Sequence, residues 1–303
     1  NPSSIACRNK CLHQPYQQDP TAMKLSLGIS PCPNDTYIFD AMLHGKIDTE
    51  GLEFVPRLED VETLNQLAIE GSLDISKVSY GVVFQLMGQY RILEAGSALG
   101  KGVGPLFVSK NIGHDEEIDF SKIRVALPGI NTTAHLLFSL AYPEVKNKTF
   151  VPFHVIEDMV INDEVDAGVI IHENRFTYQQ KGLNKLSDLG DVWEKRTGAP
   201  IPLGGILVRR LFDLDLATKI NRVINRSLAF ANDHADALPA FVTENAKEMN
   251  EEVMRNHISL YVNEFSLALG QEGRLAVLEL IKASAALNQK SLPEGLSPFL
   301  NEN

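Results

Sequence analysis

The 303-residue sequence has few cysteines, and it lacks any long apolar run. Two of its three cysteines, Cys7 and Cys11, lie among the first 22 residues, which leaves Cys32 alone in the rest of the chain. An intramolecular disulfide is therefore excluded after residue 22, and we expect a reducing, cytoplasmic location. No stretch approaches the roughly 18 apolar residues of a membrane-spanning helix. We therefore expect no membrane partner.

The sequence also has fewer basic than acidic residues. The chain has 28 Lys and Arg against 39 Asp and Glu, so its formal net charge is −11. A nucleic-acid-binding surface needs a basic stripe, and we expect no nucleic-acid partner. A small anion is not excluded, because helix N-termini and a few basic side chains can make a positive pocket in an acidic protein.

The signatures of several enzyme classes are missing as well. The sequence has no His-Glu-x-x-His pair and no cysteine cluster, which predicts no metal site. It has no Gly-x-Ser-x-Gly nucleophile turn. The glycine-rich stretch at 100–105 leads through Pro105 toward a strand, so it lacks the physical basis of a dinucleotide loop. We predict no cofactor, and we interpret this stretch as a flexible loop near a hinge.

Residues 1–22 are polar and lack the apolar stretch of a signal peptide. We predict that they are a leader or added segment outside the fold, which then begins at Met23.

From Met23 the hydrophobic pattern alternates between strands and helices. Such alternation predicts parallel βαβ units. The predicted strands are 24–30, 52–58, 105–110, 123–127, 150–155, 167–171 and 204–210, with a short one ending at Ile75. The predicted helices between them are 35–44, 61–70, 78–87, 132–141 and 157–163. After residue 214 the pattern predicts helices only, at 216–231, 238–245, 251–260 and 273–287.

Two of the predicted strands, 105–110 and 204–210, bracket the middle α/β block. A chain that crosses from one lobe to another and returns has this pattern. We therefore predict an α/β fold of two lobes, with a central cleft for the ligand and the bracketing strands as hinge. Lobe 1 would comprise 23–108 with 206–303, and lobe 2 would comprise 109–205.

Four strand-to-helix junctions are the expected site, because open α/β sheets bind ligands outside the carboxyl ends of their strands. At the first, two prolines would hold Ser30, Asn34 and Thr36 toward the cleft. The alternative is a rigid turn with Asn34 or Asp35 as the helix N-cap. We interpret Cys32 as a small buried residue, since no histidine lies near it in sequence.

The second and third junctions have hydroxyl groups. Lys77 and Ser79 are predicted to lie at the start of a helix. The positive charge of a lysine is unfavourable at that end of the helix dipole, and a bound anionic ligand would account for its presence. Thr132 and Thr133 would offer hydroxyl and N–H groups to an anion at the next helix. At both junctions the alternative is ordinary helix capping.

The fourth junction alone carries a histidine. His172 follows a buried strand and stands beside Glu173 and Arg175. With an ordinary pKa near 6.5, it suits general acid–base catalysis. The alternative is a structural imidazole.

Several of these segments resemble one known family. They are Ser30–Thr36, Leu58–Asn65, Gly100–Leu106, Ile170–Tyr178, Trp193–Gly198 and Tyr261–Ser266. Together they are similar to the 1,4-dihydroxy-6-naphthoate synthases of the futalosine route to menaquinone. The resemblance extends from Met23 to about Leu287.

The resemblance implies a fold like that of type 2 periplasmic binding proteins. It implies a lyase that converts cyclic dehypoxanthine futalosine to 1,4-dihydroxy-6-naphthoate and a small sugar-derived, dihydroxyacetone-like fragment, without cofactor or metal. The family's base maps onto His172, and its substrate contacts map onto Lys77, Val78, Ser79, Thr132 and Thr133. We add Ser30, Asn34, Thr36 and Arg175 as predicted substrate-binding residues.

The expected mechanism is removal of a proton from the sugar portion by His172, followed by retro-aldol-type carbon–carbon cleavage. One alternative is a non-catalytic two-lobed protein that binds small anions, since fold alone does not decide function. Another is the sister enzyme that dehydrates chorismate. The sequence leaves the oligomeric state open, with a homodimer among the alternatives.

Overall fold

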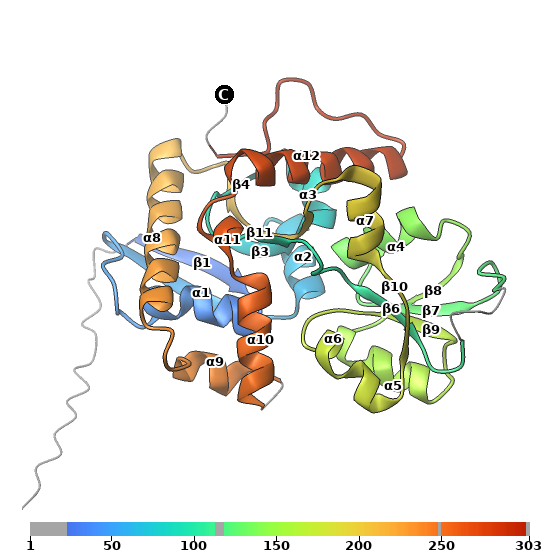
Figure 1. Cartoon of the computed structure of the whole chain (residues 1–303). Coiled ribbons are helices and arrows are strands. Elements are labelled where there is room, and N and C mark those ends of the chain that lie inside the picture. Colours follow the sequence, from blue (N-terminus) through green and yellow to red (C-terminus); the bar gives the residue numbers. More distant parts are fainter. Residues whose placement is uncertain (1–22, 113–117, 248–249, 301–303) are drawn as a thin grey trace, which may run out of the picture.

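The computed structural model describes residues 23–112, 118–247 and 250–300, and its strands form two separate sheets (Figure 1). The first sheet has the order β2–β1–β3–β11–β4, and β5 also pairs with β11. Its strands are β1 (Met23–Ile29), β2 (Leu52–Leu58), β3 (Ile75–Ser79), β4 (Tyr90–Ile92), β5 (Ala98–Gly100) and β11 (Ile201–Arg209). β1 runs parallel to β2 and β3, whereas β11 runs antiparallel to β3, β4 and β5.

The second sheet has the order β10–β6–β9–β7–β8. Its strands are β6 (Leu106–Ser109), β7 (Arg124–Leu127), β8 (Asn147–Phe150), β9 (Ala167–Ile170) and β10 (Asn184–Asp188). β7 is parallel to β8 and β9, and β6 is antiparallel to β9 and β10. Both sheets are therefore mixed: a parallel centre with antiparallel strands added.

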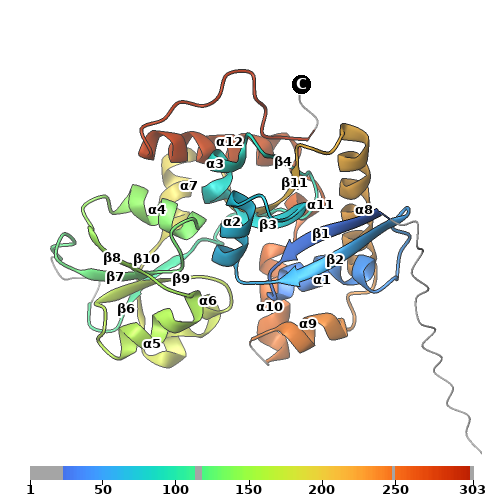
Figure 2. The same cartoon turned by 180° about the vertical axis from the view of Figure 1, so that it is seen from behind.

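Helices and short turns cover both sheets. The half of the molecule that is built around the first sheet contains α1 (Pro33–Leu43), α2 (Val61–Ile69), η1 (Tyr80–Val82), α3 (Val83–Leu86), α8 (Leu214–Asp233), α9 (Ala240–Asn245), α10 (Glu251–Tyr261), α11 (Glu264–Leu267) and α12 (Gly270–Leu287). The second half contains α4 (Thr133–Ala141), η2 (Phe153–Val155), α5 (Ile156–Ile161), α6 (Asn174–Thr177), η3 (Tyr178–Lys181) and α7 (Leu189–Thr197). α1 packs against α8, α9 and α10. Figures 1 and 2 show α12 along the edge where the halves meet, in contact with η1, α3 and β11.

The two sheets are joined by two short connections, 101–105 and 198–200. β6 pairs only within the second sheet and β11 only within the first. The predicted lobe limits, 23–108 with 206–303 and 109–205, concern which residues move together, and they stay a prediction. One hydrophobic cluster runs through both halves, since it includes Val78 and Leu207 of the first sheet and Phe107 and Val169 of the second.

Most predicted elements are present with small shifts of their ends, and two predictions are wrong. Residues 78–87 do not form one helix, because β3 continues to Ser79 through antiparallel pairing with β11. The predicted strand 150–155 is β8 at Asn147–Phe150, followed by a 3-10 turn that begins after Pro152. The polar strand β10 and helix α7 were missed, as were the three-residue strands β4 and β5.

The predicted leader, with Cys7 and Cys11, lies outside the described residues. Within the described ranges, no helix is long and apolar enough to cross a membrane.

Candidate active site

A cavity of about 90 Å³ lies between the two sheets, and all four predicted strand-to-helix junctions reach it. Eight of the ten predicted site residues line it: Ser30, Asn34, Lys77, Val78, Ser79, Thr132, Thr133 and His172. Thr36 and Arg175 are absent from its wall. The cavity is small beside the roughly 300–1,000 Å³ of typical ligand pockets, so the cleft would have to widen to hold a ligand of ordinary size.

The first junction is a buried hydrogen-bond network centred on Asp35, which is 1% exposed. Its Oδ2 accepts hydrogen bonds from the backbone N–H of Ser30 at 3.2 Å and from the Ser30 hydroxyl at 2.7 Å. Its Oδ1 accepts from Lys77 Nζ at 2.7 Å and from Asn34 Nδ2 at 2.9 Å. Every lone-pair direction of this carboxylate is thus in use, which is what a buried charge requires.

The predicted capping role for Asn34 or Asp35 is wrong. The N-cap of α1 is Cys32, and its side chain makes no capping hydrogen bond. The Thr36 hydroxyl donates to the Cys32 carbonyl at 3.1 Å and is fully buried. Thr36 therefore holds the first turn of the helix, behind the wall of the cavity.

Lys77 and Ser79 lie in β3, so the prediction that they open a helix is wrong. The Lys77 ammonium is buried against Asp35, and it also donates to the Gly96 carbonyl at 3.3 Å. Its charge is thus balanced by a protein carboxylate. The Ser79 backbone donates to Asn65 Oδ1 at 2.8 Å, and its hydroxyl oxygen accepts from Asn65 Nδ2 at 3.2 Å.

The third junction is the N-terminus of α4. The Thr132 hydroxyl accepts from the backbone N–H of His135 at 3.2 Å, so it is the helix N-cap, and it donates to Gly129. The Thr133 hydroxyl accepts from the backbone N–H of Gly81 at 3.0 Å and donates to the Leu203 carbonyl. Both hydroxyls are occupied, and the free donors at this wall are first-turn backbone N–H groups, which lack partners within a helix.

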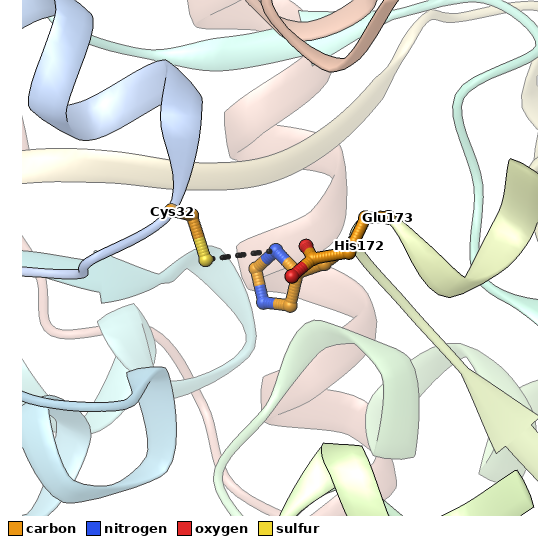
Figure 3. Close-up of side chains that lie close together, drawn as sticks. All are labelled: Cys32, His172 and Glu173. Carbon is orange, nitrogen blue, oxygen red and sulfur yellow. Dashed lines mark hydrogen bonds between the residues drawn. The ribbon is translucent and has the colours of Figure 1, made fainter. Parts of the chain in front are cut away.

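His172 stands where β9 ends, in a left-handed backbone conformation with φ of +56°. Its ring packs against Phe153 with centroids 4.9 Å apart. Its Nδ1 lies 3.6 Å from Cys32 Sγ, and Figure 3 shows the two side chains converging from α1 and from the segment after β9. A thiol 140 positions away in the sequence thus makes a weak contact with the imidazole, which no local sequence pattern indicated.

Burial sets the protonation states at this junction. It lowers the pKa of His172 below its ordinary value of 6.5, although the carboxylates of Glu173 and Asp35 oppose this shift. It also raises the pKa of Cys32 far above its ordinary value, with a further contribution from Glu173. Near neutral pH the site therefore presents a neutral imidazole beside a protonated thiol. The first can accept a proton, and the second is a poor nucleophile.

Arg175 supports the backbone of the first connection between the sheets. Its guanidinium donates to the carbonyls of Gly104 at 2.6 Å and Gly102 at 3.0 Å, and it lies 3.4 Å from Asp188. It therefore orders residues 101–105, of which Val103, Gly104 and Pro105 line the cavity.

Cys32, His172 and Glu173 are the described residues best placed to hold a metal ion, with ligand atoms within 4.8 Å of one another. A metal ion here would have to displace the proton of the buried Cys32 thiol, and the three residues would supply three of its ligands.

Sequence reasoning missed His257 and Tyr261, which line the cavity from α10. His257 lies 85 positions after His172, yet their rings are stacked with centroids 6.1 Å apart. A signal was present: Met254, His257 and Tyr261 are spaced as one helix face, and all three are buried. A histidine within such an apolar stripe is a buried polar group that needs hydrogen-bond partners, so it is a candidate site residue.

Two contacts join the halves on either side of the cavity. Glu62 of α2 accepts from the backbone N–H of Asn131 at 3.0 Å and from its side-chain amide at 2.8 Å. On the other side, Lys247 Nζ lies 4.9 Å from the Phe153 ring centre and 3.2 Å from His154 Nδ1. These contacts link the two halves beside the cavity.

Comparisons with known proteins show the family of the chain. A family model described as menaquinone biosynthesis matches residues 25–286. A 1,4-dihydroxy-6-naphthoate synthase from Thermus thermophilus is 44% identical over 266 residues, which is 86% of this chain and 94% of that protein.

Two solved structures show the fold. A crystal structure of a protein from Archaeoglobus fulgidus has a TM-score of 0.81 at 33% identity, and the match covers 88% of this chain and 98% of that one. The periplasmic aliphatic sulphonate binding protein of Escherichia coli has a TM-score of 0.61 at 10% identity, with 90% and 89% covered. The predicted periplasmic-binding-protein-like fold is confirmed, whereas such distant likenesses show the fold alone and give no support to the binding-protein alternative. The chain belongs to the family of 1,4-dihydroxy-6-naphthoate synthases, lyases of menaquinone biosynthesis.

Proposed function

We propose that the chain converts cyclic dehypoxanthine futalosine to 1,4-dihydroxy-6-naphthoate and a small sugar-derived fragment, with His172 as the base. The observation that carries this proposal is a neutral, partly buried imidazole on the cavity wall. Burial lowers the pKa of His172, so the ring is unprotonated at neutral pH and ready to accept a proton. Its left-handed backbone supports the same role, since strained conformations gather at active sites.

The proposed reaction is a retro-aldol-type cleavage. His172 takes the proton of a sugar hydroxyl, and the electron pair of that O–H bond forms a carbonyl. The neighbouring carbon–carbon bond breaks, and its electron pair passes to the ring portion, which becomes aromatic. The carboxylates of Glu173 and Asp35 stabilise the imidazolium that forms, because nearby negative charge favours the protonated ring.

The rest of the cavity would orient the substrate. Thr133 and Ala134 place the N-terminus of α4 on the wall, where N–H groups and the helix dipole favour the naphthoate carboxylate. The Ser79 hydroxyl lies on the same wall. Closure of the lobes over the substrate would exclude water from the electron-rich intermediate. A cytoplasmic location and a homodimer stay predictions.

The test is incubation of the full chain with cyclic dehypoxanthine futalosine, with products followed by mass spectrometry. His172→Asn is the informative variant, because asparagine tolerates the left-handed conformation and has no basic nitrogen. We expect wild type to form dihydroxynaphthoate and the variant to lose at least a hundredfold in turnover while it still binds substrate. His234→Gln changes an exposed histidine and is the matched control. Undiminished turnover by His172→Asn would remove His172 as the base.

A further inference from the structure

Two buried atoms beside the cavity lack hydrogen-bond partners, although they belong to strongly polar groups. Among the described residues, the buried side-chain atoms without a partner are Glu157 Oε1, Glu173 Oε2 and His257 Nδ1. The last two face each other at 3.9 Å, and their side chains are 11% and 1% exposed. Of these three residues only His257 lines the cavity; Glu173 directly follows His172 of the cavity wall in the sequence, whereas Glu157 has no such neighbour.

The hydrogen-bond network makes Nδ1 of His257 an acceptor. Asn34 Nδ2 donates to Asp35 Oδ1 at 2.9 Å, which fixes the amide so that its Oδ1 faces His257. The reverse orientation would set the amide oxygen against the carboxylate. His257 Nε2 therefore carries the hydrogen and donates it to Asn34 Oδ1 at 2.9 Å. Burial and the neighbouring His172 lower the pKa of His257 well below its ordinary value, so Nδ1 keeps its lone pair.

The gap between Glu173 and His257 is therefore bounded by two acceptors. Neither atom can bond to the other, and an unpaired buried polar atom costs about 1–3 kcal/mol. An apolar side chain at 257 would continue the stripe of Met254 and Tyr261 without that cost. A ligand that supplies two hydrogen-bond donors to these atoms would remove that cost.

Two neighbouring hydroxyls satisfy this requirement, since each donates one hydrogen to one acceptor. We propose that Glu173 Oε2 and His257 Nδ1 form a hydroxyl subsite, which binds a pair of adjacent hydroxyls on the sugar-derived part of the substrate. This inference rests on the proposed function, because it takes its ligand from that substrate. The subsite adjoins His172, whose ring stacks on that of His257. It therefore holds the sugar portion beside the base.

The variant His257→Gln tests the subsite with little change to its surroundings. A glutamine amide can reach the Nε2 position and keep the bond to Asn34, but it offers no acceptor in place of Nδ1. Binding is measured by calorimetry in the His172→Asn background, so that turnover does not interfere. The ligands are cyclic dehypoxanthine futalosine and an analogue that lacks one of the two adjacent hydroxyls. His234→Gln in the same background is the control.

We expect His257→Gln to weaken binding of the parent compound about ten- to hundredfold. The analogue should bind more weakly than the parent to the background protein, yet it should lose nothing further in the His257→Gln variant. Such non-additivity identifies a direct interaction between the removed groups. A purely structural role for His257 would weaken both ligands by the same factor.

Three results would overturn the subsite. The first is that His257→Gln weakens binding of the analogue by the same factor as binding of the parent compound. The second is that the parent compound binds equally to the background protein and to its His257→Gln variant. The third is that both ligands bind equally to the background protein. The last result would show that the gap holds water alone. If His257→Gln does not fold, Glu173→Gln in the same cycle replaces one acceptor oxygen with a donor. Wild type that forms no dihydroxynaphthoate would overturn the proposed function together with the subsite, whereas an active wild type with multiplying losses overturns the subsite only.

Discussion

The two sheets bring opposite kinds of polar chemistry to the same cavity. On the β1 side, Asp35 and Lys77 form a buried ion pair in which the carboxylate has four hydrogen-bond donors. On the β9 side, His172 has one weak thiol contact, and Glu173 has an oxygen without a partner. A satisfied network holds its geometry whether or not a ligand is bound. Unused acceptors and a neutral base are what remain available to a substrate.

This difference predicts which measured property each substitution will change. Changes in the Asp35–Lys77 network should appear mainly in the free energy of unfolding, and changes at His172 and Glu173 should appear mainly in kinetics and binding. The following predictions test that division, and they begin with the largest effect.

Asp35→Asn should give the largest loss of stability. It leaves the buried ammonium of Lys77 without its counter-charge, which in other buried pairs costs about 3–5 kcal/mol. Urea unfolding of the variant measures the change. Asp35→Asn combined with Lys77→Met removes both charges and should recover part of the loss. A single variant within about 1 kcal/mol of wild type would contradict the structural role of the pair.

Gly81→Ala should disturb the place where the halves touch. A Cβ atom there would lie 2.8 Å from the Thr132 carbonyl oxygen and 2.9 Å from the Thr133 nitrogen, both backbone atoms. We expect a loss of about 1–3 kcal/mol, with a raised KM because the cleft closes poorly. Gly88→Ala is the control, since nothing lies within 4 Å of its added Cβ. Equal effects of both substitutions would argue against a close contact at Gly81.

The pH profile should report the neutral imidazole. Because burial lowers the pKa of His172, kcat/KM should stay level from neutral pH down to below 6.5, and then fall about tenfold per pH unit as the ring takes up a proton. Glu173 raises this pKa, so Glu173→Gln should move the inflection to lower pH. An inflection above 6.5 in wild type would mean that the carboxylates outweigh burial.

Cys32→Ala should have the smallest effect on turnover. The raised pKa of the Cys32 thiol keeps it protonated, and the thiolate is the nucleophilic form. We expect kcat to change less than about fivefold, because only a weak contact with the ring is lost. Steady-state kinetics of Cys32→Ala and of Cys32→Ser would measure it. A loss of a hundredfold or more would move Cys32 into the chemistry.

The sequence predicted the alternation of strands and helices because buried strands and amphipathic helices leave clear periodicities. It placed His172 correctly at a strand end on the cavity wall. It failed at Lys77 and Ser79, since a short apolar run does not distinguish a strand from a helix and antiparallel pairing with β11 decided the matter. It missed His257 because packing of α10 on α1 brings that residue to the site, over a separation that no local pattern records.

The backbone of His172 also sets a limit on how stable this protein can become. A left-handed residue with a side chain costs about 1 kcal/mol, and glycine adopts the same φ of +56° without that penalty. His172→Gly would relieve this strain but also remove the packing of the ring on Phe153, so we expect it to change the melting temperature little while it abolishes turnover. The strained position is thus a cost in stability that the proposed reaction would explain.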